Sequence, residues 1–264
     1  VLYVNGIALG VLELKRSIIS VGDGIRQNLG NQRKDFIQPF FATMQLIMAG
    51  NDSEGLRYGV IATTEKYYLT WKEDPTEEER TDEKNARKVD TSENALDRHL
   101  TQLCAKQRLL EIIHDFVVFD AGTKKLCRPN QYFGVRKAQE RVRAREGGII
   151  WHTQGSGKSL TMVWLARWIR ENVRDARVLI ITDRTELDEQ IEKVFKGVNE
   201  DISRTKSGQD LINQLNATTP WLICSLVHKF AGKDGREESD VAGFIAEMKR
   251  SLPPGFAAKG DLYI

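Results

Sequence analysis

The apolar and polar positions of the first fifteen residues predict a β-hairpin. Residues 1–4 form a β-prone run, Asn5-Gly6 is a strong two-residue turn signal, and residues 7–15 supply the return strand. On the return strand Glu13 and Lys15 are two residues apart, so they project from one face while their neighbours Leu12 and Leu14 project from the other.

Helical spacing follows the hairpin. Apolar residues from Phe36 to Met48 recur with a helical period, and the polar turn at residues 50–52 ends that predicted helix. Short strands are predicted at 58–63 and 67–71, and residues 96–118 regain a helical apolar period. Between them, residues 72–95 are charged and poor in apolar side chains, which predicts a domain boundary formed by a solvated surface helix or loop.

Strands alternate with helices in the second half of the chain. Strands are predicted at 148–152, 177–182, 221–225 and from 261, and helices at 159–172 and about 186–195. This alternation is typical of an α/β fold with a parallel sheet covered on both faces. We expect Trp151, Trp164 and Trp168 to pack inside this fold.

Composition narrows the class of protein. A chain of 264 residues with 41% apolar and 29% charged residues forms one large or two medium domains with a proper core. No apolar stretch approaches 18 residues and no secretion signal opens the chain, so a cytoplasmic protein is expected. The odd, widely spaced cysteines favour neither a zinc site nor disulfides; they are Cys104, Cys127 and Cys224.

Charge is balanced overall but not locally. The formal net charge is only +2, which excludes little about partners. Residues 124–145 are strongly basic, with Glu140 as the one acidic residue, so they could face DNA or lie solvated on a helix. The basic side chains are Lys124, Lys125, Arg128, Arg136, Lys137, Arg141, Arg143 and Arg145.

The strongest chemical signal is a glycine-rich turn between a predicted strand and a predicted helix. Such a turn lets backbone N–H groups surround phosphates at a helix N-terminus. Lys158 would add a cation to the phosphates, and the Ser159 hydroxyl would hold Mg²⁺. His152 stands where the usual pattern has its first glycine. The residues that would cradle the nucleotide are Thr153, Gln154, Gly155, Ser156, Gly157, Lys158 and Ser159.

The string from His152 to Ser159 resembles motif I of superfamily 2 helicases, and of type I restriction enzyme motor subunits in particular. Residues 178–190 resemble the family's motif Ia, residues 223–230 its next block, and residues 128–138 its glutamine-bearing segment. The resemblance implies a RecA-like domain that uses ATP and Mg²⁺, with Gln131 reading the adenine edge and Arg184 and Lys229 contacting the DNA backbone. A plain surface amide is the alternative interpretation of Gln131.

The hairpin resembles the nuclease end of the same family. Glu13-Leu14-Lys15 matches the ExK half of the PD-(D/E)xK signature, in which carboxylates hold Mg²⁺ and the lysine orients the attacking water. An exposed ion pair is the alternative interpretation. Gln27 matches the glutamine of a helix motif beside that nuclease site, with Asn31 in place of its tyrosine; a solvent-exposed amide and Gln32 are the alternatives.

Together the resemblances imply the restriction subunit of a type I restriction–modification enzyme. Its domains would be a PD-(D/E)xK endonuclease domain at 1–71, a charged connector at 72–107 and the first RecA-like domain at 108–264. The resemblance places one further catalytic Asp just before Val1 and Asp-Glu-x-His just after Ile264, so a truncated and by itself inactive segment is expected.

The implied activity is ATP-dependent translocation on double-stranded DNA coupled to Mg²⁺-dependent cleavage. The implied partners are the modification (methyltransferase) and specificity subunits, and no membrane is involved. Two alternatives stay open. One is a stand-alone superfamily 2 DNA helicase or remodeller without nuclease activity, and the other is a catalytically inactive nucleic-acid-binding module.

Overall fold

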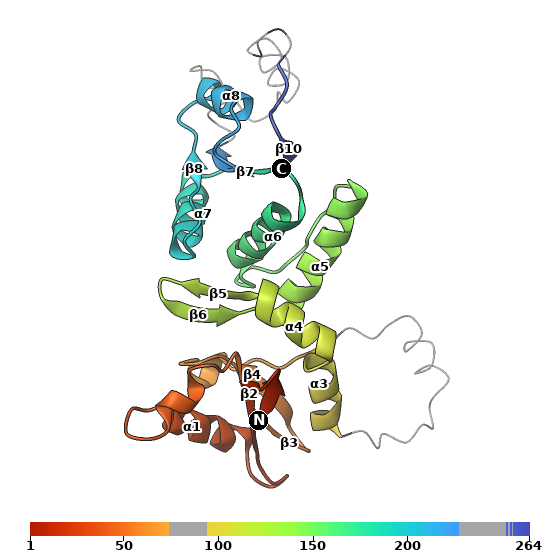
Figure 1. The fold of residues 1–264 in the computed structure, drawn as a ribbon, viewed down its shortest axis with the longest axis vertical. Helices are drawn as coiled ribbons and strands as arrows, with labels where there is room; N and C mark the ends of the chain where they lie inside the picture. Colours follow the sequence, from red (N-terminus) through yellow and green to blue (C-terminus); the bar gives the residue numbers. More distant parts are fainter. Residues whose placement is uncertain (74–93, 227–251, 253, 255) are drawn as a thin grey trace, which may run out of the picture. The chain divides into compact units, whose positions relative to one another are not determined.

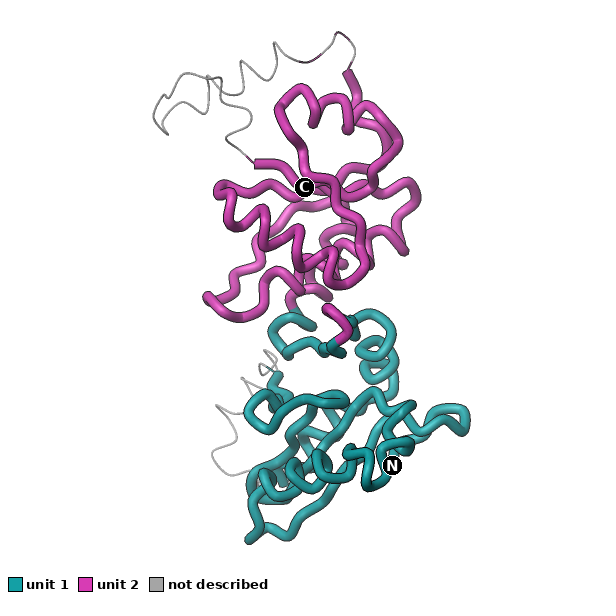
Figure 2. The backbone as a smooth tube through the Cα atoms, turned by 90° about the vertical axis from the view of Figure 1, so that its left-hand side faces the viewer, with its two compact units in different colours: residues 1–119, 123–133 teal, residues 120–122, 134–264 magenta. Residues whose placement is uncertain are grey.

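The computed structural model describes residues 1–73, 94–226, 252, 254 and 256–264. Within this part of the chain, two compact units are present (Figure 2). The first comprises residues 1–119 and 123–133, and the second comprises residues 120–122 and 134–264. Residues 74–93 of the predicted charged connector lie outside the described residues, as do residues 227–230 of the last resemblance block, Lys229 included. Each unit is mixed α/β, as the pattern predicts.

A four-stranded sheet with the order β1-β2-β3-β4 forms the first unit (Figure 1). The strands are β1 (Leu2–Val4), β2 (Ile7–Leu14), β3 (Leu46–Asn51) and β4 (Gly55–Gly59). β1 and β2 are antiparallel with Val4 opposite Ile7, and both turn residues, Asn5 and Gly6, have positive φ angles of 49° and 80°. These angles fit a type I′ turn, so the predicted hairpin is confirmed.

Helix α1 (Val21–Asn31) crosses from β2 to β3, which run parallel, and covers one face of the sheet. Its apolar side chains Val21 and Ile25 join a core with Phe41, Met44 and Ile47. The helix begins after Ser20, whose hydroxyl accepts a hydrogen bond from the Gly22 N–H at 3.2 Å. A short 3₁₀ turn, η1 (Gln38–Phe41), leads from α1 toward β3.

The opposite face of the sheet carries helix α3 (Ala95–Leu103). A side chain on Gly50 of β3 would collide with Leu96, whereas its neighbour Ala49 faces α1, so the two helices lie on opposite faces. Helix α4 (Lys106–Asp115), the hairpin of β5 (Val117–Asp120) and β6 (Thr123–Leu126), and helix α5 (Pro129–Ala144) follow in the chain. A second turn, η2 (Glu65–Tyr67), follows β4.

A parallel four-stranded sheet with the order β10-β7-β9-β8 forms the second unit. The strands are β7 (Ala176–Thr182), β8 (Ser203–Arg204), β9 (Leu222–Leu226) and β10 (Asp261–Tyr263). Helices α6 (Lys158–Asn172) and α7 (Thr185–Gly197) and helix α8 (Gly208–Asn216) alternate with them. Leu179 and Ile223 pack against α8, while their neighbour Cys224 contacts Asp188 of α7, so helices cover both faces.

A buried arginine holds the end of α8 to this sheet. Arg177 on β7 is only 2% exposed and donates hydrogen bonds of 2.8–3.2 Å to the carbonyl oxygens of Gln214, Leu215, Ala217, Pro220 and Lys259. The last carbonyls of a helix lack partners within the helix, and the guanidinium supplies them. Burial lowers the pKa of Arg177.

Four predicted elements are wrong. The predicted strand at 67–71 is the end of η2 and a single bridge from Leu69 to Tyr58, while the strand predicted at 58–63 lies earlier, as β4. The predicted helix at 36–48 is the turn η1 followed by strand β3, whose residues are all buried, and a short apolar run buried on both faces carries no strand signature. The predicted helix at 96–118 is two helices and the start of β5. The predicted strand at 148–152 pairs with no strand of the described residues, so Trp151 is 89% exposed instead of packed; Trp164 and Trp168 are buried as predicted.

Candidate active sites

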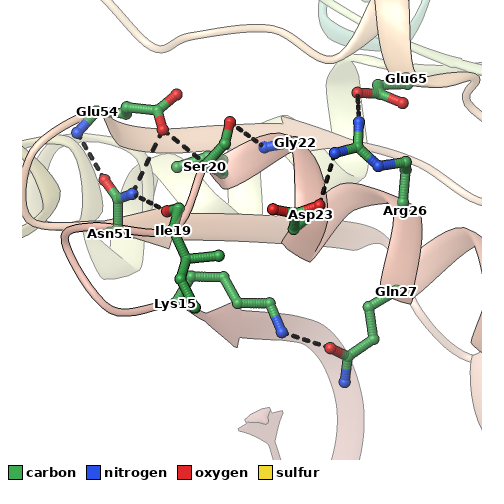
Figure 3. Close-up of polar contacts among 11 residues, drawn as sticks. Lys15, Ile19, Ser20, Gly22, Asp23, Arg26, Gln27, Asn51, Glu54 and Glu65 are labelled. Carbon is green, nitrogen blue, oxygen red and sulfur yellow. Dashed lines mark hydrogen bonds and ion pairs between the residues drawn. The ribbon is translucent and has the colours of Figure 1, made fainter.

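The first candidate site lies where β2 meets α1. Lys15 follows the end of β2, and its Nζ donates to Glu13 Oε1 at 2.8 Å and to Gln27 Oε1 on α1. Figure 3 shows the Lys15 side chain reaching toward Gln27. The structure therefore brings together the three side chains that the sequence singles out, although 12 residues separate Lys15 from Gln27.

These side chains are accessible to solvent without being freely exposed. The Glu13 side chain is 25% exposed and the Lys15 side chain 18% exposed. A carboxylate in this position has lone pairs left for a divalent cation, and a neighbouring ammonium can orient water or stabilise phosphate charge. Glu13 is the one predicted metal ligand of this site, and its accessible oxygens fit that role.

The alternative glutamine is used elsewhere. Gln32 accepts a hydrogen bond from the Ala62 N–H at 2.8 Å, and its own amide donates to the Asn28 carbonyl oxygen at 3.1 Å. Gln27 is thus the glutamine that reaches Lys15, whereas Gln32 ties the end of α1 to the segment after β4.

Gly24 brings α1 close to this site, and the sequence interpretation missed it. A methyl group at Gly24 would lie 3.1 Å from Ala49 Cβ, 3.4 Å from Lys15 Cγ and 3.5 Å from Glu13 Cγ. Only a residue without a side chain lets the helix backbone approach so near. The signal available in the sequence was a glycine one turn before Gln27, on the same side of the helix.

A polar network anchors the N-terminus of α1 (Figure 3). Glu54 accepts from the Val21 N–H at 3.0 Å, and Asn51 at the end of β3 donates to the Ile19 carbonyl oxygen at 2.7 Å. Farther along the helix, Arg26 pairs with Asp23 and with Glu65, both partners at least 42% exposed. The first two contacts fix the loop that joins β2 to α1, and with it the register between Lys15 and Gln27.

The second candidate site is the glycine-rich turn before α6. Gly155 and Gly157 have φ angles of 75° and 85°, which only glycine adopts readily, and Lys158 is the first residue of the helix. Lys158 Nζ donates to the Thr153 carbonyl oxygen at 3.0 Å, and the Ser156 N–H donates to the same oxygen at 3.3 Å. The loop thus presents a lysine, backbone N–H groups and a helix N-terminus together, which is a phosphate-binding arrangement.

Two hydroxyl groups of this loop differ in their surroundings. Ser156 is 7% exposed, and its buried Oγ has no hydrogen-bond partner in the described residues. Ser159 lies in the first turn of α6. Thr153 and Gln154 are exposed on the loop. The accessible Ser159 fits the predicted magnesium role, because that role needs a hydroxyl on the open side of the loop.

Gln131 is held by its own helix. Its Oε1 accepts from the Arg128 N–H at 2.8 Å, and the residue is only 3% exposed. This contact closes the first turn of α5 as a glutamine three residues after the N-cap does in a capping box. The adenine contact that the resemblance implies for Gln131 stays a prediction.

The basic residues of 124–145 mostly have partners within the protein. Lys124 is buried and donates to the Met44 carbonyl oxygen at 3.1 Å and to Gln45, so it does not face DNA; burial lowers its pKa. Within the second unit, Arg145 forms two 2.9 Å contacts with Asp261, and Arg143 lies over the Trp168 ring. Arg184 lies just before α7 with a 74% exposed side chain, 3.7 Å from Asp183 Oδ2.

The two candidate sites lie in different compact units and offer different chemistry. One compact unit presents a carboxylate, an ammonium and an amide beside a strand, and the other presents a phosphate-binding loop on a parallel α/β sheet. In the described part of the chain, no helix is both long and apolar enough to cross a bilayer.

Comparison with known proteins finds that the chain is similar to type I restriction enzyme endonuclease subunits. Residues 1–66 match the family model of the type I restriction enzyme R protein N terminus, and residues 130–257 match that of the SWI2/SNF2 ATPase. The predicted resemblance is therefore confirmed. An ATPase-type region and a restriction-type N-terminus imply the use of a nucleotide and a divalent metal in general terms.

Individual relatives agree. The chain is 27% identical over 265 residues to the putative type I restriction enzyme MjaIXP endonuclease subunit of Methanocaldococcus jannaschii, covering 90% of this chain and 24% of the relative. It is 29% identical over 227 residues to the HindI endonuclease subunit of Haemophilus influenzae, covering 80% and 20%. It is 26% identical to the SauCOLORF180P endonuclease subunit of Staphylococcus aureus, covering 86% and 24%. The chain thus spans 20–24% of the length of these relatives.

Proposed function

We propose that this chain belongs to the restriction subunit of a type I restriction–modification enzyme. The subunit moves double-stranded DNA with energy from ATP and cleaves it with Mg²⁺. It works with modification and specificity subunits, which recognise the target. In this proposal residues 1–71, within the first unit, form a PD-(D/E)xK nuclease domain. Residues 72–107 connect it to a RecA-like motor domain at 108–264, which includes the second unit.

One observation carries the proposal. A single chain holds both a Glu13–Lys15–Gln27 cluster on β2 and α1 and a glycine-rich loop with Lys158 at the start of α6. Metal-dependent nuclease chemistry can use the first arrangement, and nucleotide hydrolysis can use the second. A stand-alone helicase accounts for the loop but gives no reason for the cluster.

Each residue then has a defined task. Glu13 would hold Mg²⁺, which supplies an activated water and neutralises the cleaved phosphate. Lys15 stabilises the developing charge, and Gln27 fixes the direction of the lysine ammonium through its amide oxygen. At the second site, Lys158 contacts the nucleotide phosphates, Ser159 would hold the magnesium that accompanies them, and Gln131 contacts the adenine.

Cleavage of unmodified supercoiled plasmid tests the nuclease half. The full-length protein, assembled with its partner subunits, is given Mg²⁺ and ATP. We expect Glu13→Gln to cut at least roughly 100-fold more slowly than wild type, because it removes a metal-binding charge. The matched control Asp35→Asn removes an exposed carboxylate that pairs with Arg33, and it should cut normally. Normal cutting by Glu13→Gln would contradict the nuclease assignment.

A further inference from the structure

His152, which interrupts the usual glycine pattern of the phosphate loop, has a defined seat in the second unit. Its imidazole packs on helix α5 at Gly134: a methyl group at Gly134 would lie 3.2 Å from both Cε1 and Nε2 of the ring. The same methyl group would lie 3.5 Å from Ile150 Cγ2. The ring therefore occupies space that any other residue at position 134 would fill.

Packing rather than hydrogen bonding holds the ring. The buried Nδ1 of His152 has no hydrogen-bond partner in the described part of the chain. The residues beside it are open to solvent, since Trp151 is 89% exposed and Thr153 is exposed as well. His152 is thus an inward-facing anchor in a segment that otherwise has no regular secondary structure between α5 and α6.

The anchor lies directly before the atom that organises the loop. The carbonyl oxygen of Thr153, the next residue, accepts from Lys158 Nζ at 3.0 Å and from the Ser156 N–H at 3.3 Å. Because the peptide plane between His152 and Thr153 is rigid, the place of the imidazole constrains where residue 153 starts. The seat at Gly134 therefore constrains the loop and its lysine through one residue.

We propose that His152 is a positioning residue for nucleotide binding, with Gly134 as its seat on α5. The ring fixes the start of the phosphate loop, so that the loop meets the triphosphate of the nucleotide without first being ordered. A glycine at position 152 has no ring to anchor the loop, and its backbone loses more conformational freedom when the loop is ordered on nucleotide binding. This inference rests on the nucleotide binding proposed above and adds two residues that contact no phosphate themselves.

The most direct variant restores the common pattern. His152→Gly recreates the usual spacing of glycines, yet we expect it to weaken the binding of MgATP roughly fivefold, because the unanchored loop must be ordered on binding. Gly134→Ala should weaken binding to a similar extent by displacing the ring. Alanine favours a helix interior over glycine, so Gly134→Ala should not lower the unfolding temperature for that reason.

The experiment measures the dissociation constant of a fluorescent ATP analogue with Mg²⁺ on the full-length protein, with the unfolding temperature of each variant alongside. Gly147→Ala is the matched control, because a methyl group there would meet nothing within 4 Å. The single variant His152→Ala is measured as well. The double variant Gly134→Ala/His152→Ala should bind MgATP as His152→Ala does, since the added methyl group has no ring left to displace.

The outcomes separate cleanly. The inference is supported if His152→Gly and Gly134→Ala both lose affinity for the ATP analogue at an unchanged unfolding temperature, and if the effects in the double variant are not additive. Wild-type affinity in His152→Gly overturns it, and so does strict additivity in the double variant. If wild type binds no nucleotide, or Lys158→Ala binds as well as wild type, the proposed nucleotide site itself fails and the inference falls with it.

Discussion

At the scale of single residues, the clearest feature of the first unit is that Lys15 has two partners of different kinds. The Glu13 carboxylate pairs with the charge of the Lys15 ammonium, and the Gln27 amide oxygen accepts a hydrogen bond that orients it. An ion pair this accessible contributes little stability by itself, about 0–1 kcal/mol. Its value is therefore chemical, and removing a partner should affect cleavage much more than folding.

Gln27 tests this distinction. We expect Gln27→Ala to lower the rate of plasmid cleavage roughly tenfold or more while leaving the unfolding temperature within about 1 °C, because the amide only orients the lysine. Gln38→Ala, on the exposed turn η1, serves as a control, because Lys15 donates to Glu13 and Gln27 and not to this amide. Equal cleavage by the two variants would remove Gln27 from the site.

His99 makes the stability of the first unit depend on pH. Burial lowers the pKa of His99, and the positive charges of Arg98, Arg57 and Lys72 lower it further. Its Nδ1 also accepts a hydrogen bond from the Leu56 N–H at 3.2 Å, which requires that nitrogen to be unprotonated. The unfolded chain, with a histidine pKa of about 6.5, then binds the proton more readily than the folded one. Stability is complete above about pH 6.5 and falls as the pH drops below it.

Thermal unfolding between pH 7 and pH 5 measures this dependence. His99→Gln keeps an acceptor for the Leu56 N–H but cannot titrate, so its unfolding temperature should fall less steeply with pH than that of wild type. A slope that His99→Gln does not alter would assign the pH dependence to other groups.

Arg177 should be the most sensitive polar residue of the second unit. Arg177→Met leaves five buried or partly buried carbonyl oxygens without their donor, so we expect a loss of about 3 kcal/mol in the free energy of unfolding. Arg174→Met, at a side chain that is 95% exposed, should change stability by less than about 0.5 kcal/mol. Chemical denaturation of both variants distinguishes them, and similar midpoints would contradict the role given to Arg177.

At the scale of elements, two glycines of α1 give a matched pair. Gly24→Ala places a methyl group 3.1 Å from Ala49 Cβ and should push the helix away from β2 and β3, costing about 1–3 kcal/mol and separating Gln27 from Lys15. Gly30→Ala meets nothing within 4 Å and should stabilise the helix by up to about 1 kcal/mol. Chemical denaturation measures the change in the free energy of unfolding for both variants, and the opposite signs test the close approach of helix and sheet. A stabilised Gly24→Ala would refute that approach.

The elements that could be predicted from sequence are those with local signals. Asn5-Gly6 identifies the hairpin because few other residue pairs accept two positive φ angles, and the glycine-rich turn identifies α6. β3 was mistaken for a helix because its six buried residues show no alternation. The segment at 148–152 looks like a strand from its side chains, but strand formation requires a neighbour, which a sequence pattern does not reveal.

The candidate sites follow the same logic. The spacing of Glu13 and Lys15 on a strand is a local property and could be predicted, and so could the phosphate loop. The contact of Gln27 with Lys15 came from family resemblance rather than from geometry. The roles of Gly24 and Gly134 depend on which side chain lies opposite in space. The spacing of Gly24 from Gln27 is a hint in the sequence, whereas nothing in the sequence pairs Gly134 with His152.

At the scale of the whole molecule, the proposed function assigns two separable activities to one polypeptide. Each compact unit has its own core and its own candidate site. A change in one site should therefore leave the chemistry of the other intact, except where cleavage depends on prior translocation.

The measurement that tests this most directly follows plasmid cleavage and DNA-stimulated ATP hydrolysis together, in the full-length protein with its partner subunits. Lys15→Ala should cut at least roughly 100-fold more slowly while hydrolysing ATP at the wild-type rate, and Lys158→Ala should lose both activities. Lys34→Ala, on the exposed loop after α1, should keep both. Normal cutting by Lys15→Ala would contradict the nuclease role of the first unit and leave a motor whose first unit has another task.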